Sequence, residues 1–164
     1  MHKNAVGKTR EKIIEQVKAQ GESVRDFASY APIGNAVEKL DKWVRQGAEI
    51  IYLSALTEDK KARGDEVIGK EGLSTDKEIL DRHSFPKGKI YHRQKGESYA
   101  QIAEKIMPDI LIEDDCESIG GEKEMTITFI KPEIQQRIRS VVIKEFGGID
   151  HLPDDLGKLL KYKS

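Results

Sequence analysis

Two short apolar stretches, AEIIYLS at residues 48–54 and DILIED at residues 109–114, decide the fold. Each is too short for a buried helix and too continuously apolar for a surface strand, so each is typical of a strand covered on both faces. A segment with the apolar spacing of a helix precedes each stretch, at residues 35–47 and 97–107. This alternation predicts an α/β fold with a mainly parallel sheet.

Two further segments extend the pattern outward from these stretches. KIYHR at residues 89–93 and SVVIKEF at residues 140–146 also have strand character, and the second follows the helical pattern PEIQQRIR. We therefore expect the four strands to be parallel neighbours in one sheet, with helices on both sides of it.

The remaining helices are predicted from apolar spacing and from residues that begin or end helices. They lie at residues 9–20 with Thr9 as N-cap, at residues 22–30, and after Pro153. Asn35 and Glu38 have the spacing of a capping box at the start of the helix before the first strand. Residues 57–75 are polar and predict a charged helix or an ordered loop, whereas residues 117–131 predict no regular element.

Composition limits the classes of function. The 164 residues include 28 Lys and Arg against 29 Asp and Glu, so no overall positive charge attracts nucleic acid or an anionic membrane surface. The sequence contains no apolar run near the roughly 20 residues that span a bilayer. Cys116 is the single cysteine, which excludes an intramolecular disulfide and favours a reducing cytoplasm. These features predict a soluble cytoplasmic protein without a nucleic-acid or membrane partner.

Residues suited to catalysis or ligand binding follow the predicted strands. In an open parallel sheet, ligands bind where the strands have their carboxyl ends, because loops and helix N-termini meet there. Ser54 ends the first predicted strand, and Glu113, Asp114 and Asp115 end the third. Adjacent carboxylates repel one another unless a cation compensates them, and oxygen-rich clusters suit Mg²⁺. Lys95 precedes the helix that leads into the acidic strand, so it belongs to the same predicted edge.

In this order and spacing, IIYLSA, the Lys95 region and ILIEDD resemble the haloacid dehalogenase (HAD) superfamily of phosphohydrolases, particularly its small-cap nucleotidase-like members. The resemblance covers roughly residues 33–116. It implies that Ser54 binds a phosphoryl oxygen and that Lys95 stabilises the phosphoryl charge. It also implies that Asp114 and Asp115 bind Mg²⁺, with Glu113 taking part if the motif is shifted by one residue.

The sequence departs from this family in its first motif. The family has an Asp-x-Asp pair at the end of its first, central strand, and this chain contains no Asp-x-Asp. We expect either that some ten to fifteen residues of strand and loop are missing or that the chain is a natural degenerate relative. Residues 1–34 are then a remnant of a small helical cap, and residues 35–164 are a HAD-like three-layer core. Without its central strand, the core should pair its neighbouring strands directly or form a homodimer.

Two functions follow from these expectations. The first is a Mg²⁺-dependent phosphatase of a small phosphorylated molecule, which is inactive as given because the nucleophilic aspartate is absent and which holds Mg²⁺ weakly. The alternative is a noncatalytic α/β module that binds a phosphorylated ligand or a protein partner. Cys116 follows the acidic pair, and we expect it to be a small buried apolar side chain at a helix start rather than a reactive thiol.

Overall fold

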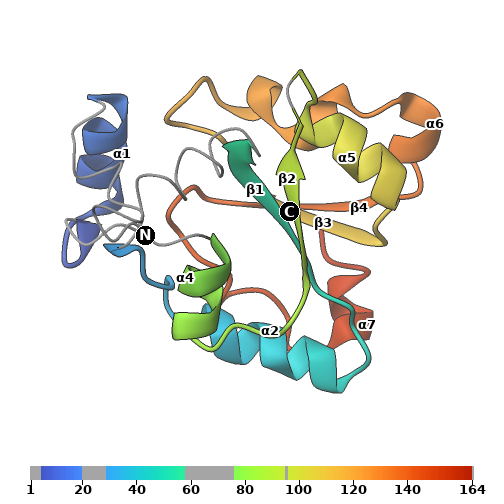
Figure 1. Ribbon diagram of the computed structural model, residues 1–164, viewed down its shortest axis with the longest axis horizontal. Helices are drawn as coiled ribbons and strands as arrows, with labels where there is room; N and C mark the ends of the chain where they lie inside the picture. Colours follow the sequence, from blue (N-terminus) through green and yellow to red (C-terminus); the bar gives the residue numbers. More distant parts are fainter. Residues whose placement is uncertain (1–4, 20–28, 58–75, 95, 164) are drawn as a thin grey trace.

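The computed structural model describes residues 5–19, 29–57, 76–94 and 96–163, except for the side chains of residues 55–57. Figure 1 shows the arrangement of its helices and strands. In chain order these are α1 (Arg10–Lys18), α2 (Ala36–Arg45), β1 (Ile51–Thr57), α4 (Asp76–Arg82), β2 (Lys89–Arg93), α5 (Tyr99–Ile106), β3 (Ile110–Asp114), the 3₁₀ helices η4 (Glu122–Glu124) and η5 (Thr126–Phe129), α6 (Pro132–Gln135), β4 (Arg139–Ile143) and α7 (Leu156–Leu159).

The strands form two parallel pairs. β1 pairs with β2 from Ile51 opposite Lys89 to Ser54 opposite His92, after which the register shifts. β3 pairs with β4 in an unbroken register that ends with Asp114 opposite Ile143. Over the described residues these are two separate two-stranded sheets, so the expectation of one four-stranded sheet, and of direct pairing between β1 and β3, is wrong. A buried-strand pattern indicates that both faces are covered, but it carries no information about which edges are hydrogen-bonded.

The sheet of β3 and β4 has helices on both faces. Leu111 and Val142 point to one face, where α5, η5 and neighbouring residues pack. The alternate residues of the two strands, Ile110, Ile112, Val141 and Ile143, point to the other face, where they meet α2 and α7. The core side chains on the first face are Ala100, Ala103, Met125, Ile127, Ile130 and Ile138, and those on the second are Trp43, Val141, Leu152 and Leu159. This helix–sheet–helix layering agrees with an α/β fold.

Leu53 of β1 packs against the same cluster as Leu111 of β3. The two strand pairs are therefore connected through side chains of one apolar core. Burying such side chains stabilises the folded chain by about 1.5–3 kcal/mol each relative to exposure. Apolar packing therefore joins the two sheets into one structure.

α2 is fastened to the segment that follows β4. The Asn35 N–H donates to Asp150 Oδ1 at 2.9 Å, and Trp43 Nε1 donates to the Pro153 carbonyl oxygen at 2.9 Å. Asn35 is the N-cap residue as expected, but its side chain makes no capping hydrogen bond, so the predicted capping box is wrong. Its backbone N–H instead donates to the carboxylate of Asp150, which is distant in the sequence. A local sequence motif does not predict such a contact.

A complete capping box begins α5. The Gln101 N–H donates to Ser98 Oγ at 3.2 Å, and the Ser98 N–H donates to Gln101 Oε1 at 2.8 Å. Reciprocal bonds of this kind satisfy amide groups that have no partner within the helix. The boundary of α5 is therefore set locally, and the helix expected over residues 97–107 is confirmed.

The other predicted elements are confirmed in position and differ in length. α1 follows Thr9 as expected, although the Thr9 side chain makes no capping bond. α6 and α7 are single turns, and the region 117–131 contains two short 3₁₀ turns. The predicted helix at 22–30 lies outside the described residues except for its last two positions, as do residues 58–75. No helix among the described residues is long and apolar enough to cross a membrane.

Candidate site at the carboxyl end of β3

Asp114 is the last residue of β3 and Asp115 is the next residue along the chain. Asp114 Oδ1 accepts a hydrogen bond from the Cys116 N–H at 2.8 Å, which closes a tight turn directly after the strand. Asp115 Oδ1 accepts from the Glu145 N–H at 3.0 Å, and Asp115 Oδ2 lies 3.0 Å from Lys144 Nζ. The two neighbouring aspartates thus face different surroundings, one within its own turn and the other at the end of β4.

Asp115 is the more buried of the two, with 7% of its surface exposed. Burial by itself favours the neutral acid, but the hydrogen bond from the Glu145 N–H and the charge of Lys144 favour the carboxylate. The second set of effects is larger, so the pKa of Asp115 lies below its ordinary value. Asp115 is therefore an ionised group whose two oxygens are already used by donors of this chain.

Glu113 also has a partner within the protein. Its two carboxylate oxygens accept hydrogen bonds from the Thr126 N–H at 2.6 Å and the Ile127 N–H at 3.0 Å. These are amide groups of the first turn of η5, where a negative side chain is favourable. Glu113 therefore connects η5 to β3, and both of its carboxylate oxygens are used in doing so.

The cations that surround Asp115 were not predicted from the sequence. Arg10 of α1 lies 3.6 Å from Asp115 Oδ1 and forms an ion pair with Glu117. Lys144 follows only once the strand register is known, since Asp114 is opposite Ile143 and the next residues along the two strands are Asp115 and Lys144. Arg10 offered no such signal because it lies on a helix more than one hundred residues earlier.

The fit to a divalent cation is incomplete. Mg²⁺ takes six oxygen ligands in near-octahedral geometry and keeps several waters. Asp115 and Glu113 use their oxygens on donors of the protein, and Asp114 alone leaves an oxygen for which the described part of the chain shows no partner. Across the described ranges, no three His, Cys, Asp or Glu side chains are grouped as a metal site. These residues alone do not complete a magnesium site.

Ser54 lies within β1 and not at its end, because β1 continues to Thr57. Its hydroxyl donates to Asp76 Oδ2 at the start of α4. His92, which is opposite Ser54 in β2, has its Nδ1 3.7 Å from the same carboxylate oxygen. The structure thus groups Ser54 with Asp76 and His92, two residues that the sequence analysis did not associate with it. Lys95, the second predicted catalytic residue, lies outside the described residues.

Cys116 has a left-handed backbone with φ of 51° and packs, partly buried, against the core cluster that includes Leu111. Its carbonyl oxygen accepts hydrogen bonds from the N–H groups of Ile119, Gly120 and Gly121. Burial and the nearby Asp114 charge raise the pKa of the thiol to about 11. Cys116 thus packs against the core as expected, but it is only partly buried and begins a turn and not a helix.

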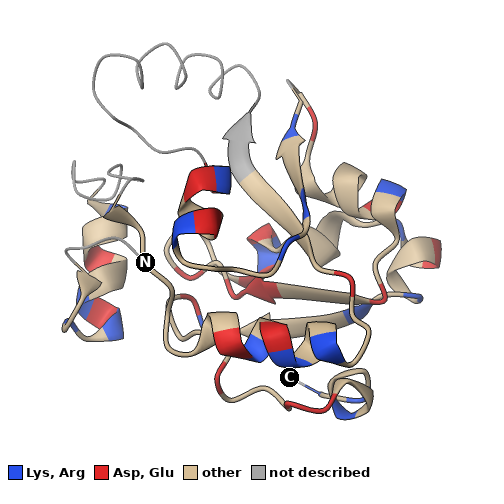
Figure 2. Ribbon diagram, turned by 60° about the horizontal axis from the view of Figure 1, so that its bottom comes forward, with Lys and Arg blue, Asp and Glu red and all other residues tan. Residues whose placement is uncertain are grey.

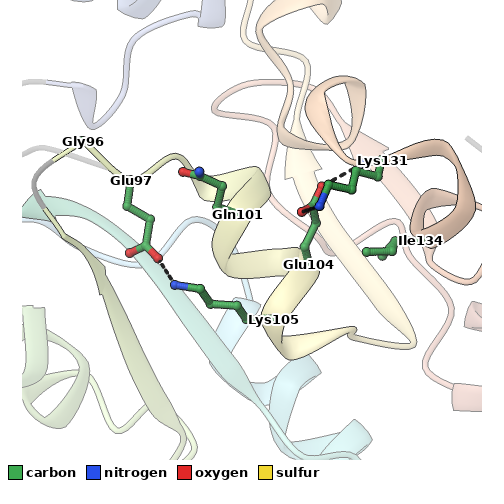
Figure 3. Close-up of a pocket in the computed structure, with 7 residues that line it drawn as sticks. All are labelled: Gly96, Glu97, Gln101, Glu104, Lys105, Lys131 and Ile134. Carbon is green, nitrogen blue, oxygen red and sulfur yellow. Dashed lines mark hydrogen bonds and ion pairs between the residues drawn. The ribbon is translucent and has the colours of Figure 1, made fainter.

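A separate open cleft of about 490 Å³ lies between α5 and α6. Figure 3 shows two ion pairs along it, Glu97 with Lys105 and Glu104 with Lys131. None of the residues that line it belongs to the predicted site. Acidic and basic side chains lie next to one another along α2 and α4 (Figure 2), so charges of opposite sign are interleaved on these helices.

Comparison of the chain with protein-family models, with curated proteins and with solved structures gave no match.

Proposed function

We propose that the chain has a HAD-like phosphohydrolase core that receives a small phosphorylated molecule at the carboxyl ends of its parallel strands. The observation that carries this proposal is the position of Asp114 and Asp115, which are the last residue of a parallel strand between two helical layers and the residue after it. Ligands of open parallel sheets bind at this end, where loops from several strands meet.

Ser54 and Lys95 supply the contacts to the phosphoryl group in this proposal. The Ser54 hydroxyl donates a hydrogen bond to Asp76 and turns to a phosphoryl oxygen when the ligand is present. Lys95 contributes a positive charge that attracts the phosphate dianion. Mg²⁺ supplies additional positive charge when it is bound. It binds weakly, because Asp114 is the one carboxylate of the acidic stretch with an oxygen to offer among the described residues.

The chain as given binds without turnover in this proposal. Phosphoryl transfer in the HAD superfamily, which the chain resembles, needs an aspartate nucleophile from an Asp-x-Asp pair. The sequence lacks such a pair. A serine and a lysine orient a phosphate but do not form an aspartyl phosphate.

Two measurements test the proposal. Calorimetric titration with inorganic phosphate should show binding that is lost in Lys95→Met and retained in Lys87→Met, an exposed lysine before β2. Hydrolysis of p-nitrophenyl phosphate with Mg²⁺ should stay at background. Turnover that disappears in Asp114→Asn would show an unidentified nucleophile and contradict the proposed inactivity.

The alternative is a noncatalytic module that binds a protein partner. Its noncatalytic character is favoured by the internal hydrogen bonds of Glu113 and Asp115, because both carboxylates are already bound by donors of this chain. A folded chain that binds no phosphate in the titration above would support this alternative and reject the phosphate site.

A further inference from the structure

α4 contacts β1 through its first residue and through the loop that follows it. Asp76 accepts a hydrogen bond from the Ser54 hydroxyl of β1. In the loop, Phe85 packs edge-on against Tyr52, whose hydroxyl donates to the Pro86 carbonyl oxygen at 2.8 Å. No side chain of α4 is fully buried. Because apolar burial contributes little here, the polar contact of Asp76 carries much of the docking of α4.

His92 of β2 faces the same carboxylate. It is opposite Ser54 in the parallel pair, and paired residues direct their side chains to the same face of a sheet. Its Nδ1 lies 3.7 Å from Asp76 Oδ2, which is longer than a hydrogen bond. This nitrogen is enclosed, and the described residues give it no hydrogen-bond partner. A buried polar atom without a partner is uncommon, so the gap between Nδ1 and the carboxylate needs an explanation.

The neighbouring charged groups lie away from this gap. Arg93 follows His92 in β2, and successive residues of a strand point to opposite faces. Its guanidinium lies 4.7 Å from the centre of the Tyr99 ring of α5, the helix that packs on that opposite face. Among the described residues, Asp76 is the carboxylate within ion-pair distance of His92. The charge of Asp76 therefore acts on the His92 ring at close range.

We propose that His92 and Asp76 form a pH-sensitive contact that fastens α4 to the β1–β2 pair more tightly at mildly acidic pH. A neutral imidazole carries one N–H, on either nitrogen, whereas the protonated ring carries N–H at both nitrogens and a positive charge. The protonated ring donates from Nδ1 to Asp76 Oδ2 once the two atoms approach by about 1 Å. A carboxylate oxygen has lone pairs for this bond and for the Ser54 hydroxyl together.

The pH range follows from the general chemistry of the two side chains. Histidine changes its charge between about pH 5 and pH 8, a range in which aspartate is ordinarily ionised. Lowering the pH through this range adds the positive charge while the carboxylate stays negative. The docking of α4 therefore strengthens as the pH falls and weakens as it rises. This inference goes beyond the proposed function and holds whether or not the sheet receives a phosphate.

The test is hydrogen exchange of the full chain at about pH 5.5 and about pH 7.5, on either side of the ordinary histidine pKa. Protection factors correct for the intrinsic effect of pH on exchange, and the amides of β3 serve as the internal reference. The α4 amides should be roughly tenfold better protected at the lower pH, as gain of one charge-assisted hydrogen bond predicts. Because this comparison uses the unaltered chain, equal protection at both pH values would by itself overturn the proposal.

Three variants assign the effect to its residues. His92→Asn places an amide that does not titrate near the position of Nδ1, and Asp76→Asn removes the charge of the carboxylate. The tenfold difference should disappear in both variants. His83→Gln is the matched control, because His83 Nε2 lies 2.9 Å from the Tyr30 carbonyl oxygen, which accepts an N–H from the neutral and the protonated ring alike. It should keep the difference. A difference that persists in His92→Asn or Asp76→Asn, or that is lost in His83→Gln, would overturn the proposal.

Discussion

The buried ammonium group of Lys39 in α2 donates a hydrogen bond to the carbonyl oxygen of Leu152 at 2.7 Å. Lys39 is only 8% exposed, and it also forms an ion pair with Asp154. A lysine is rarely this buried without partners, because removing its charge from water is costly. Both partners belong to the segment after β4, so the charged side chain of Lys39 connects α2 to that segment through a hydrogen bond and an ion pair.

Replacing Lys39 by Met should destabilise the fold by about 1.5–3 kcal/mol, because the Leu152 carbonyl oxygen loses a charged donor in a buried position. Urea denaturation gives this free energy. Lys42→Met is the matched control, since Lys42 bonds the same Asp154 from a side chain that is 38% exposed. It should cost less than about 1 kcal/mol. Equal losses in the two variants would show that burial of Lys39 is unimportant.

Leu159 and Leu160 form a second matched pair, because they are adjacent and differ in burial. Leu159 is 1% exposed and packs with Trp43 and Val141, whereas Leu160 is 43% exposed. Leu159→Ala should lower the free energy of unfolding by about 2–5 kcal/mol through lost burial and the cavity left behind. Leu160→Ala should change it by about 0.5 kcal/mol or less. A large effect at Leu160 would contradict the described orientation of α7.

Asp115 should contribute to stability in a defined pH range. Its pKa is lower in the folded chain than the ordinary value of 3.8, so the unfolded state binds more protons in that range. The contribution is present above about pH 4 and is lost as the pH falls through the folded-state pKa. Urea denaturation at a series of acidic pH values should show a shallower acid-side decline in Asp115→Asn. Asp109→Asn, at an exposed position, should keep the wild-type slope.

Cys116 should react slowly with alkylating reagents. The thiol titrates at a pKa of about 11 in the folded chain, so little of the reactive thiolate exists near pH 8. Iodoacetamide labelling followed by mass spectrometry should be much slower in the folded chain than in urea, where the pKa returns to its ordinary range. Equal rates in both conditions would mean that the thiol is neither buried nor affected by Asp114.

Among the described residues, each strand pair has edges without a partner strand, and such edges predict self-association. A two-stranded sheet is marginally stable by itself, and an edge without a partner strand tends to pair with another chain. Static light scattering is therefore expected to give about twice the mass of one chain. A monomer at all concentrations would show that side-chain packing such as that of Leu53 is sufficient to cover these sheets.

The strands could be predicted from the sequence because their signal is local. KIYHR coincides with β2, and five of the six residues of DILIED form β3. The end of β1 was misplaced at Ser54 because the polar serine interrupts an apolar run, although the backbone remains extended to Thr57. The separation into two sheets could not be predicted, since edge pairing depends on residues far apart in the chain.

For the candidate site too, the sequence predicts the local features but not the tertiary contacts. The acidic pair after β3 was identified from its position, but the contacts of each carboxylate were not. Asp115 meets Arg10 across more than one hundred residues and Glu113 meets the backbone of η5, whose segment showed no periodic pattern. Contacts of this kind depend on tertiary structure, so a cluster of carboxylates in a sequence does not reveal whether its charges are available to a ligand.

The fastening of α2 to the segment after β4 has a consequence for biosynthesis. The contacts of Asn35 with Asp150 and of Trp43 with Pro153 span 115 and 110 residues. A ribosome adding about 5–20 residues per second therefore releases α2 several seconds before its partners exist. During that interval the indole of Trp43 has no carbonyl acceptor and no apolar cover from Leu152 or Leu159. The nascent chain thus passes through a stage in which Trp43 lacks these native contacts, and α2 can be fastened only after residues 150–159 have left the ribosome.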